Sequence, residues 1–563
     1  MKRLGLTLLA LLLSLSMILI GCGPEEPVDP ADPPEQPPST ETDSSYTVTE
    51  SYLPSSYANQ MKTLFESADP SFATYEQRNN APLAIPDFIT LSDCTLKSIT
   101  IPVLGTGEAE GGYYIFTLHV VSSDYAGLKR TLSDPLQTIE IEISASKYNL
   151  KDNDVVYRFI KVDLENYKIK LGKNESLAFG AATDSIYPAQ VNTYGLNNQN
   201  EKNPAAKLLL DEWGVTCHYY INADDSAFSI SQNSLLFDFE LERTYESKDA
   251  YDALMAAKAA AEAEYQQKLA AVKAAYSGKY ISMIGDSIST CEDVTNNTEY
   301  NTNLWDNDVY ANQYKIANGY NYSKVYWGKL AVDTEMNLCV MNGWSGGRVY
   351  GGKRATMVDN MLTRSYQLAN NQGVNPDLIV LYFGINDIGN SPSSIHASGN
   401  LSSIGKEGGD LYQRLTANTT KTQHEIVDEW FAEVQQQAAT SGYVQGSANN
   451  IIAGTTYTCW EAAYALSLQN ILASYDNPEV YIMTLIETNA GHASNGKLDR
   501  ANTILRALAE YFGVGIIDQQ KGYVNQSNCH IYAYDTTGLH PDMRGHALMA
   551  RLIVETLYDN LNK

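Results

Sequence analysis

Four polar motifs in the second half of the chain carry the side chains that acyl-transfer chemistry requires. Ser287 follows the apolar run 280–284, and a serine becomes a nucleophile when a base removes its proton. His540 is the best placed of the eight histidines to be that base. A backbone N–H at Gly346 and the side-chain amide of Asn386 can supply neutral donors to a developing oxyanion. Together these motifs predict a serine nucleophile with its general base and its oxyanion site.

The elements that must position these motifs are the strands of an expected parallel sheet. Alternating strand and helix patterns predict a sheet covered by helices on both faces, with reactive groups at the carboxyl ends of its strands. We therefore expect residues 279–563 to form a doubly wound α/β domain. Strands are expected at Tyr280–Ile284, Met336–Met341, Leu378–Phe383, Val480–Leu485 and Val514–Ile517, and helices at Glu425–Ala438, Tyr464–Ala473 and Ala501–Phe512.

The order of the motifs adds a resemblance to a known family. Gly-Asp-Ser alone also fits a turn followed by a helix N-cap. The four motifs, in this order, resemble those of the SGNH (GDSL) hydrolases: Gly285-Asp-Ser287, the glycine of Ser345-Gly346, Gly384-Ile-Asn-Asp387 and His540-Pro541. The resemblance covers about half of the chain and implies a three-layer α/β/α, flavodoxin-like fold. It also implies that the backbone N–H of Ser287 is a third oxyanion donor, and it implies neither a cofactor nor a metal.

Two details of the site stay open in the sequence. The family usually has an aspartate three residues before the catalytic histidine, where this chain has Thr537. Either Asp535 orients His540 as the third member of a triad, or the enzyme works as a Ser–His dyad and Asp535 only opens a turn. The glycine donor is Gly346, or Gly347 if the second motif is aligned one residue later.

Residues 46–245 have a different pattern, with many short β-patterned runs and few helical ones. Thr138–Ser144 alternates with period two, as expected of a strand with one solvated face. The pattern predicts an all-β domain of the β-sandwich or jelly-roll type, with a sugar-binding or a structural role. The clearest runs are Ser98–Val103, Tyr113–Val121, Thr138–Ser144, Val156–Asp163, Cys217–Ile221 and Leu235–Leu241.

An alanine-rich segment, 246–278, separates the two patterns and predicts a connecting helix. Ser247 can cap its start, and Gly278 lies where a helix would end. One apolar stripe, spaced for a helix, consists of Tyr265, Leu269, Val272 and Tyr276. At 1.5 Å per residue the helix would be about 40 Å long, packed on a neighbour through this stripe.

The N-terminus predicts export. Lys2 and Arg3 precede a mostly apolar run that ends Leu19-Ile-Gly-Cys22, so residues 1–21 read as a signal peptide and not as a membrane span. The ending resembles a bacterial lipobox, which implies lipid on Cys22 and anchoring to the cell envelope or surface. Residues 22–45, rich in proline and acids, are expected to be an extended tether.

The composition of the chain limits the classes of partner that it is expected to bind. The formal net charge of −27 argues against nucleic acid and against adhesion to anionic lipid. Besides Cys22 there are six cysteines, without zinc-like spacing. Because export permits disulfides, pairing within each half is conceivable, for example Cys94 with Cys217. Residues 388–456 are a long polar segment with one amphipathic helix, either a substrate-shaping flap or a solvated insertion.

These features together predict a surface-anchored serine esterase acting on an acylated polysaccharide or another ester. The carbohydrate part of this expectation rests on the export signal, the tether and the β-domain. Two alternatives remain: a lipase or lysophospholipase with the same catalytic groups, and a non-catalytic glycan-binding protein that keeps the fold.

Overall fold

The structure is a computed structural model, in which the residues described from Tyr46 onward belong to one compact unit. The expected signal peptide, Cys22 and almost all of the expected tether lie outside the described residues. None of the helices described is both long and apolar enough to cross a membrane. The residues that the structure describes are 45–51, 83–85, 92–105, 113–126, 129–132, 136–144, 147, 156–173, 175–181, 195–197, 215–219, 229–235, 238–289, 325–343, 346–349, 361–370, 372–388, 411–417, 419–440, 460–488, 496–526, 528–529, 532, 538–541 and 543–563.

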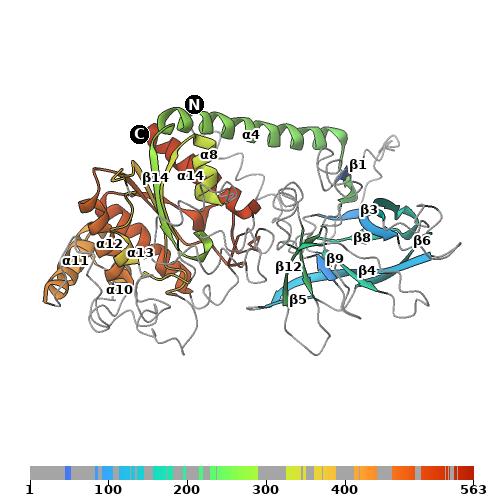
Figure 1. Ribbon diagram of the computed structural model, residues 1–563, viewed down its shortest axis with the longest axis horizontal. Helices are drawn as coiled ribbons and strands as arrows, with labels where there is room; N and C mark the ends of the chain where they lie inside the picture. Colours follow the sequence, from blue (N-terminus) through green and yellow to red (C-terminus); the bar gives the residue numbers. More distant parts are fainter. Residues whose placement is uncertain are drawn as a thin grey trace, which may run out of the picture. The chain divides into compact units, whose positions relative to one another are not determined.

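The C-terminal half is built on a five-stranded parallel sheet (Figure 1). Taken in chain order the strands lie 2-1-3-4-5, the flavodoxin-like arrangement, with the first strand between the second and third. All five expected strands are present, and the ends of each strand differ from the expected ends by at most two residues. The strands, in spatial order, are β15 (Asn337–Gly343), β14 (Tyr280–Gly285), β16 (Leu378–Tyr382), β17 (Glu479–Met483) and β18 (Gly515–Ile517).

Helices cover both faces of this sheet, as Figure 1 shows, which makes the three-layer α/β/α domain that the sequence predicts. The helices contact one another in two groups. One group consists of α4 (Lys248–Tyr276), α8 (Tyr326–Thr334) and α14 (Met543–Leu561). The other consists of α9 (Met361–Arg364), α10 (Leu411–Thr416), α11 (Gln423–Thr440), α12 (Trp460–Ser474) and α13 (Lys497–Phe512).

The sheet is buried because its strands are apolar along their whole length. Every residue of β16 is buried, and β14 is buried from Ile281 onward. Strands covered on both faces need such continuous apolar sequence, whereas a half-exposed strand alternates. Three tryptophans of the flanking helices, Trp327, Trp430 and Trp460, are among the largest fully buried side chains.

The connecting helix α4 begins and ends as the sequence predicts. The Ser247 hydroxyl accepts a hydrogen bond from the backbone N–H of Ala250, and Gly278 after the helix has a positive φ of 80°. The predicted stripe is confirmed, because Tyr265, Val272 and Tyr276 are buried and Leu269 packs against the same core.

The two halves of α4 differ in their surroundings. From Lys248 to Glu264 every residue is exposed except Tyr251, which is half-buried. The C-terminal half packs on α8 and α14. At its end the hydroxyl of Tyr276 donates a 2.5 Å hydrogen bond to Glu479 at the start of β17. The C-terminal half therefore shares one hydrophobic core with the parallel sheet.

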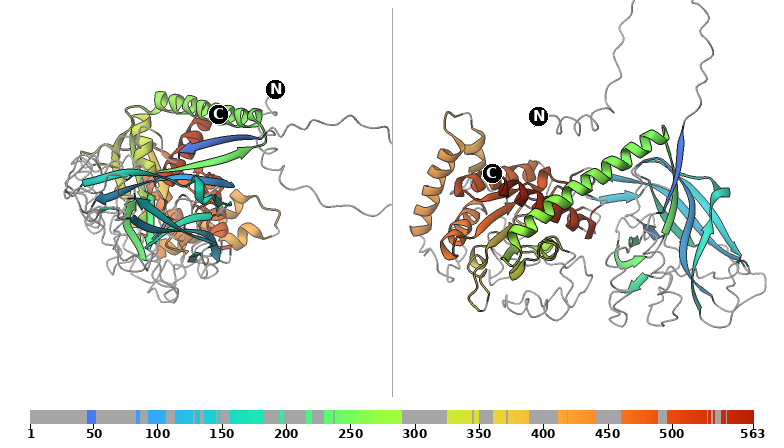
Figure 2. Two further views of the ribbon diagram at one scale, coloured as in Figure 1. Left: turned by 90° about the vertical axis from the view of Figure 1, so that its right-hand side faces the viewer. Right: turned by 90° about the horizontal axis from the view of Figure 1, so that it is seen from above.

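The N-terminal half contains two antiparallel sheets (Figure 2). The first runs β1 (Tyr46–Ser51), β13 (Asp238–Tyr245), β3 (Cys94–Gly105) and β7 (Val156–Asp163), with β8 (Ile169–Leu171) also on β3. The second runs β10 (Gly195–Asn197), β12 (Ser229–Leu235), β11 (Val215–Tyr219), β2 (Leu83–Ile85), β9 (Glu175–Ala181), β4 (Tyr113–Ala126) and β5 (Lys129–Leu132), with β6 (Gln137–Ser144) on β4.

The antiparallel class is as predicted, and the jelly-roll topology stays a prediction. The expected run at Leu235–Leu241 is two strands, because β12 ends at Leu235 and β13 begins at Asp238. Several strands were not expected from the sequence, among them β1. It pairs with β13, almost 200 residues away, so its partner could not be inferred from the neighbouring sequence.

The suggested pairing of Cys94 with Cys217 is wrong. Cys94 is a free, buried thiol, and burial raises its pKa. Cys94 is the first residue of β3 in the first sheet, whereas Cys217 lies in β11 of the second sheet. Cys339 and Cys529 are also free and buried.

Candidate active site

Strand register brings three of the four motifs to one edge of the parallel sheet. Gly285, the last residue of β14, is paired with Gly343 of β15 and with Tyr382 of β16. Ser287 follows Gly285 by two residues. Gly346 follows its strand by three residues and Asn386 by four. All three therefore leave the sheet at the carboxyl ends of adjacent strands, on the edge where open α/β sheets bind ligands.

Ser287 and His540 are within hydrogen-bond distance. The Ser287 Oγ lies 3.0 Å from the His540 Nε2, although the two residues are 253 positions apart. Ser287 is 8% exposed, in a short 3-10 turn (Ser287–Ser289) after β14, and His540 is half-buried just before α14. This distance lets an imidazole nitrogen take the serine proton directly.

The glycine before this turn is required by close packing. A Cβ at Gly285 would lie 2.1 Å from the Ser289 Oγ and 3.1 Å from the Tyr382 carbonyl oxygen. Ser289 is held in place by a 2.8 Å hydrogen bond with the Tyr326 hydroxyl on α8. The Gly-Asp-Ser turn can therefore lie against its neighbours only without a side chain at its first position.

The second and third motifs contact each other. The Asn386 Nδ2 donates a 3.0 Å hydrogen bond to the Gly347 carbonyl, and the Asp387 Oδ2 accepts a 2.9 Å hydrogen bond from the Val349 N–H. Because a carboxamide has two N–H bonds, this contact fixes the plane of Asn386 and leaves a second donor. Gly346 has a φ of 72°, a backbone conformation that favours glycine. Both candidate glycines therefore lie beside Asn386.

The proposed acid behind His540 stays a prediction. Asp535 and Thr537 lie outside the described residues, and so does Ser345. Much of the expected flap at 388–456 also lies outside them, although α10 and α11 belong to it.

Asp286 lies between Gly285 and the nucleophile, and it is an ionisable side chain to which the sequence prediction assigned no role. It is fully buried, and its Oδ1 accepts a 3.1 Å hydrogen bond from the Ile288 N–H. Burial raises the pKa of Asp286 to about 7, although the positive charges of His540 and Arg364 act in the opposite direction. The signal was present in the sequence, because this aspartate is part of the motif itself.

Arg364 is a second residue that the sequence did not indicate. It is 1% exposed in α9, and it donates to the Gly285 carbonyl at 2.9 Å and to the Asn342 Oδ1 at 2.9 Å. It also donates to the Asn342 carbonyl, and its guanidinium lies 5.0 Å from the centre of the Phe383 ring. Arg364 thereby ties the ends of β14 and β15 together and adds a buried positive charge.

His546 is buried beside the site in α14. It stacks on Tyr326 with ring centres 5.9 Å apart. Burial, with a smaller contribution from His540, lowers the pKa of His546 to about 3, so it is neutral at physiological pH. A buried, neutral ring packed on a tyrosine has a structural role.

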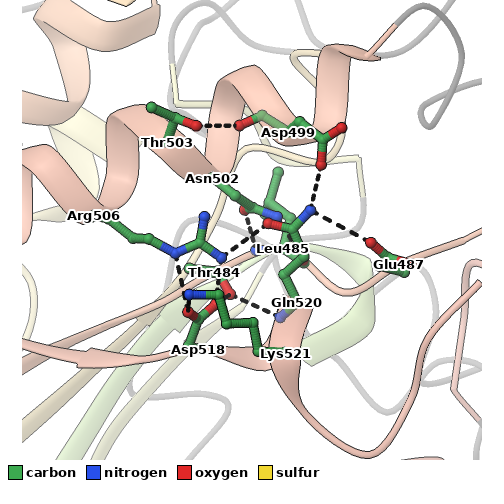
Figure 3. Close-up of polar contacts among 10 residues, drawn as sticks. All are labelled: Thr484, Leu485, Glu487, Asp499, Asn502, Thr503, Arg506, Asp518, Gln520 and Lys521. Atoms are coloured by element: carbon green, nitrogen blue, oxygen red, sulfur yellow. Dashed lines mark hydrogen bonds and ion pairs between the residues drawn. The ribbon is translucent and has the colours of Figure 1, made fainter. Parts of the chain in front are cut away.

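A polar network supports the ends of β17 and β18 (Figure 3). Arg506 on α13 donates to both carboxylate oxygens of Asp518, and Thr484 donates to Asp518 as well. The Gln520 side chain accepts from Arg506 and donates to Asp499 at 2.6 Å. The network fixes the start of the segment that follows β18, which continues toward His540.

The arrangement offers a nucleophile, a base and polarised donors, all from side chains and backbone. No group of histidines, cysteines and acids among the described residues is placed to hold a metal ion. The chemistry that these groups can perform is nucleophilic attack on a carbonyl with proton transfer through an imidazole.

Comparisons with known proteins give similarities at low identity. No known protein-family profile matches the chain, and no curated protein matches it. Among solved structures, a GDSL-like lipase from Bacteroides ovatus is 17% identical, with a TM-score of 0.25 over 49% of this chain and 96% of its own. A lipase/acylhydrolase from Enterococcus faecalis is 13% identical, with a TM-score of 0.26 over 50% of this chain and 96% of its own.

A family two carbohydrate esterase from Clostridium thermocellum, solved with cellohexaose, is 12% identical, with a TM-score of 0.25 over 88% of this chain and 97% of its own. At such TM-scores the likeness does not determine the activity, which has to be inferred from the residues of the site.

Proposed function

We propose that the chain is a serine esterase of the SGNH (GDSL) hydrolase type. The observation that carries the proposal is the 3.0 Å contact between the Ser287 Oγ and the His540 Nε2 at the carboxyl end of β14. Asn386 lies on the neighbouring strand end, where it can donate to an oxyanion. These are the three groups that hydrolysis through an acyl-enzyme requires.

The geometry supports a two-stage reaction. The Ser287 oxygen attacks the ester carbonyl carbon while His540 takes the serine proton on Nε2. The carbonyl π electrons move to oxygen, and the resulting oxyanion is stabilised by Asn386, Gly346 and the backbone N–H of Ser287. The imidazolium then returns the proton to the departing alkoxide, which leaves as an alcohol.

Water completes the cycle by the same steps in reverse order. His540 removes a proton from water, the hydroxide adds to the acyl-enzyme, and the carboxylic acid leaves as the Ser287 oxygen is protonated. Because Nε2 must accept a proton in both stages, its lone pair has to face Ser287 and the other ring nitrogen has to carry a proton. The Asp535→Asn variant tests whether Asp535 holds that second nitrogen.

We also propose that the substrate is an acyl group on a carbohydrate and that the enzyme acts at the cell surface, anchored by lipid on Cys22. The support is the sequence 1–45, with its signal-like run and its extended tether, and the antiparallel β-sheets that precede α4. A lipase acting on long acyl chains is the second candidate, because it would use the same catalytic groups.

Three measurements test the proposal. A fluorophosphonate probe should label Ser287 in the wild type, and Ser287→Ala should abolish both labelling and acetate release from acetylated glycans, with a loss of at least about 10³-fold in kcat. p-Nitrophenyl esters of increasing chain length separate the candidates: preference for acetyl supports the carbohydrate esterase, and preference for long chains supports the lipase. If the wild type is folded but is not labelled, the esterase proposal fails and the alternative of a non-catalytic glycan-binding protein is favoured.

A further inference from the structure

We propose that Asp286 is a positioning residue for His540, whose buried carboxylate stabilises the imidazolium that forms when Ser287 attacks. The inference rests on the proposed esterase function and deepens it. Asp286 directly precedes the nucleophile, and its role is distinct from the oxyanion donors, because it acts on the positive charge of the reaction and not on the negative one.

The carboxyl group is oriented, and one of its oxygens is not used by the fold. The Oδ1 accepts a hydrogen bond from the Ile288 N–H at 3.1 Å, within the turn that carries Ser287. The Oδ2 is buried and has no hydrogen-bond partner among the residues that the structure describes. A buried carboxyl oxygen without a partner is costly for folding, so its retention beside a nucleophile calls for a functional explanation.

The charges around Asp286 come from several elements. Arg364 on α9 and His540 before α14 both favour the ionised carboxylate, whereas burial favours the protonated acid. Tyr382 on β16 and His546 on α14 are buried in their neutral forms. Burial raises the pKa of Asp286 to about 7, and a positive charge on His540 favours the ionised carboxylate.

This coupling has a direct use in the reaction. When the Ser287 proton moves to the His540 Nε2, the site gains a positive imidazole and a negative oxyanion. In a buried site of low effective dielectric, a nearby carboxylate stabilises the imidazolium more than it would in water. Asp286 supplies that charge from the residue directly before the nucleophile, in a chain where Thr537 occupies the position at which the SGNH family usually has its aspartate.

The decisive variant is Asp286→Asn, which keeps an oxygen for the Ile288 N–H and removes the charge. With p-nitrophenyl acetate at pH 8 we expect kcat to fall at least about 10-fold, with KM changed less than twofold. The acidic limb of the kcat/KM profile should move to lower pH, because the imidazolium loses a stabilising charge. The matched control is Asp333→Asn, which removes one carboxylate from α8, and it should retain the wild-type kcat and profile.

Other outcomes separate the two proposals. If the wild type neither hydrolyses the ester nor is labelled by fluorophosphonate, the esterase function fails. If the wild type is active and Asp286→Asn has its kcat and pH profile, the role of Asp286 is refuted. Asp535→Asn measured in parallel shows whether that residue has the larger effect on the same profile, and a loss confined to Asp535→Asn would also refute the role of Asp286.

If Asp286→Asn does not fold, the wild type alone provides the test. With histidines labelled by 13C at Cε1, and the His540 signal identified by its absence from His540→Asn, the signal should show two inflections with pH. One reports the imidazole itself and the other reports the ionisation of Asp286. A single inflection for His540 would overturn the inference.

Discussion

At the scale of single residues, burial moves the pKa values of Asp286 and His546 toward the neutral forms of these side chains. The pKa of Asp286 is raised to about 7 and that of His546 is lowered to about 3. Both groups titrate at more ordinary values in an unfolded chain, so each makes stability depend on pH. The two dependences have opposite signs, and they can be separated by substitution.

His546 should make the folded protein sensitive to acid. Between pH 6.5 and 3 the unfolded chain binds a proton on this residue and the folded chain does not, so stability is lost as pH falls through that range. His546→Phe retains a ring to stack on Tyr326 and removes the titration. Between pH 7 and pH 5 we expect the wild type to lose up to about 2 kcal/mol more unfolding free energy than this variant. Urea unfolding followed by tryptophan fluorescence measures it, and equal losses in both proteins would contradict it.

Asp286 should have the reverse effect. Because its folded pKa is raised, the folded chain binds the extra proton, and this contribution to stability is present at low pH and lost as pH rises toward 7. Asp286→Asn has no proton to lose. From pH 5 to pH 8 the stability of the variant relative to the wild type should therefore rise, by up to about 3 kcal/mol. The same urea experiment checks it, and a relative stability that does not change with pH would exclude a strongly raised pKa.

Substitution of Gly285 should act through steric overlap and not through a change of charge. In Gly285→Ala the new methyl would lie 2.1 Å from the Ser289 Oγ and 3.1 Å from a backbone oxygen of β16. Relief requires Ser289 to leave its hydrogen bond with Tyr326 and the turn to shift. We expect about 1–3 kcal/mol of destabilisation and a fall in kcat larger than any rise in KM, because Ser287 moves with the turn. Gly278→Ala is a useful comparison, since open space surrounds that position and its cost comes from backbone strain alone.

At the scale of elements, Arg551 is one polar attachment of α4 to the parallel-sheet domain. Its guanidinium lies 4.2 Å from the centre of the Tyr265 ring on α4 and 5.6 Å from the Tyr523 ring. It also pairs with Glu262 at 3.0 Å and with Glu555 at 3.4 Å. A planar guanidinium can make cation–π contacts with both rings, and an ammonium group in its place would interact with them less favourably.

Removing this attachment should loosen the C-terminal half of α4. For Arg551→Met we expect faster amide hydrogen exchange in residues 262–276 and a loss of about 1–2 kcal/mol, because the exposed ion pairs contribute little and the ring contacts more. Arg551→Lys keeps the charge and should recover only part of the loss. Exchange rates in both variants equal to those of the wild type would show that the apolar stripe holds the helix by itself.

The elements that the sequence predicted best are those whose signals are local. Ser247, Gly278 and the apolar stripe of α4 are separated by fixed helical spacing, so its start, end and buried face could all be inferred. The strands of the parallel sheet are continuous apolar runs ended by polar motifs, and their ends could be located for the same reason. Arg364 could not be inferred, because its importance comes from carbonyls of two strands that only the folded chain brings together.

The antiparallel half was less predictable. β1 is a six-residue strand whose partner lies across almost 200 residues, and β8 and β10 have three residues each. Strands this short carry too few residues to show a period. At the site, the motifs indicated where Ser287, Asn386 and His540 would lie. The protonation of Asp286 could not be predicted, because it depends on how deeply the folded chain buries this side chain.

At the scale of the whole molecule, α4 belongs energetically with the sequence that follows it. Tyr265, Val272 and Tyr276 are part of the same hydrophobic core as the parallel sheet. A fragment containing residues 246–563 should therefore fold and hydrolyse p-nitrophenyl acetate, whereas 279–563 would expose that core. Because each buried side chain of this kind contributes about 1.5–3 kcal/mol, the shorter fragment should be several kcal/mol less stable. Circular dichroism and urea unfolding of the two fragments check this, and equal stabilities would contradict it.

The solvated first half of α4 has a consequence for how such a chain can change over generations. Positions 248–264 are filled mainly by alanine, glutamate and lysine, and all of them except Tyr251 are exposed. Selection there acts on helix propensity more than on the identity of each residue, so substitutions can accumulate quickly. A genetic exchange with its junction in this stretch would replace the preceding module without creating a cavity in the core of the parallel-sheet domain. The helix is thus a natural splice point, at which this domain can acquire a new neighbour by a single recombination.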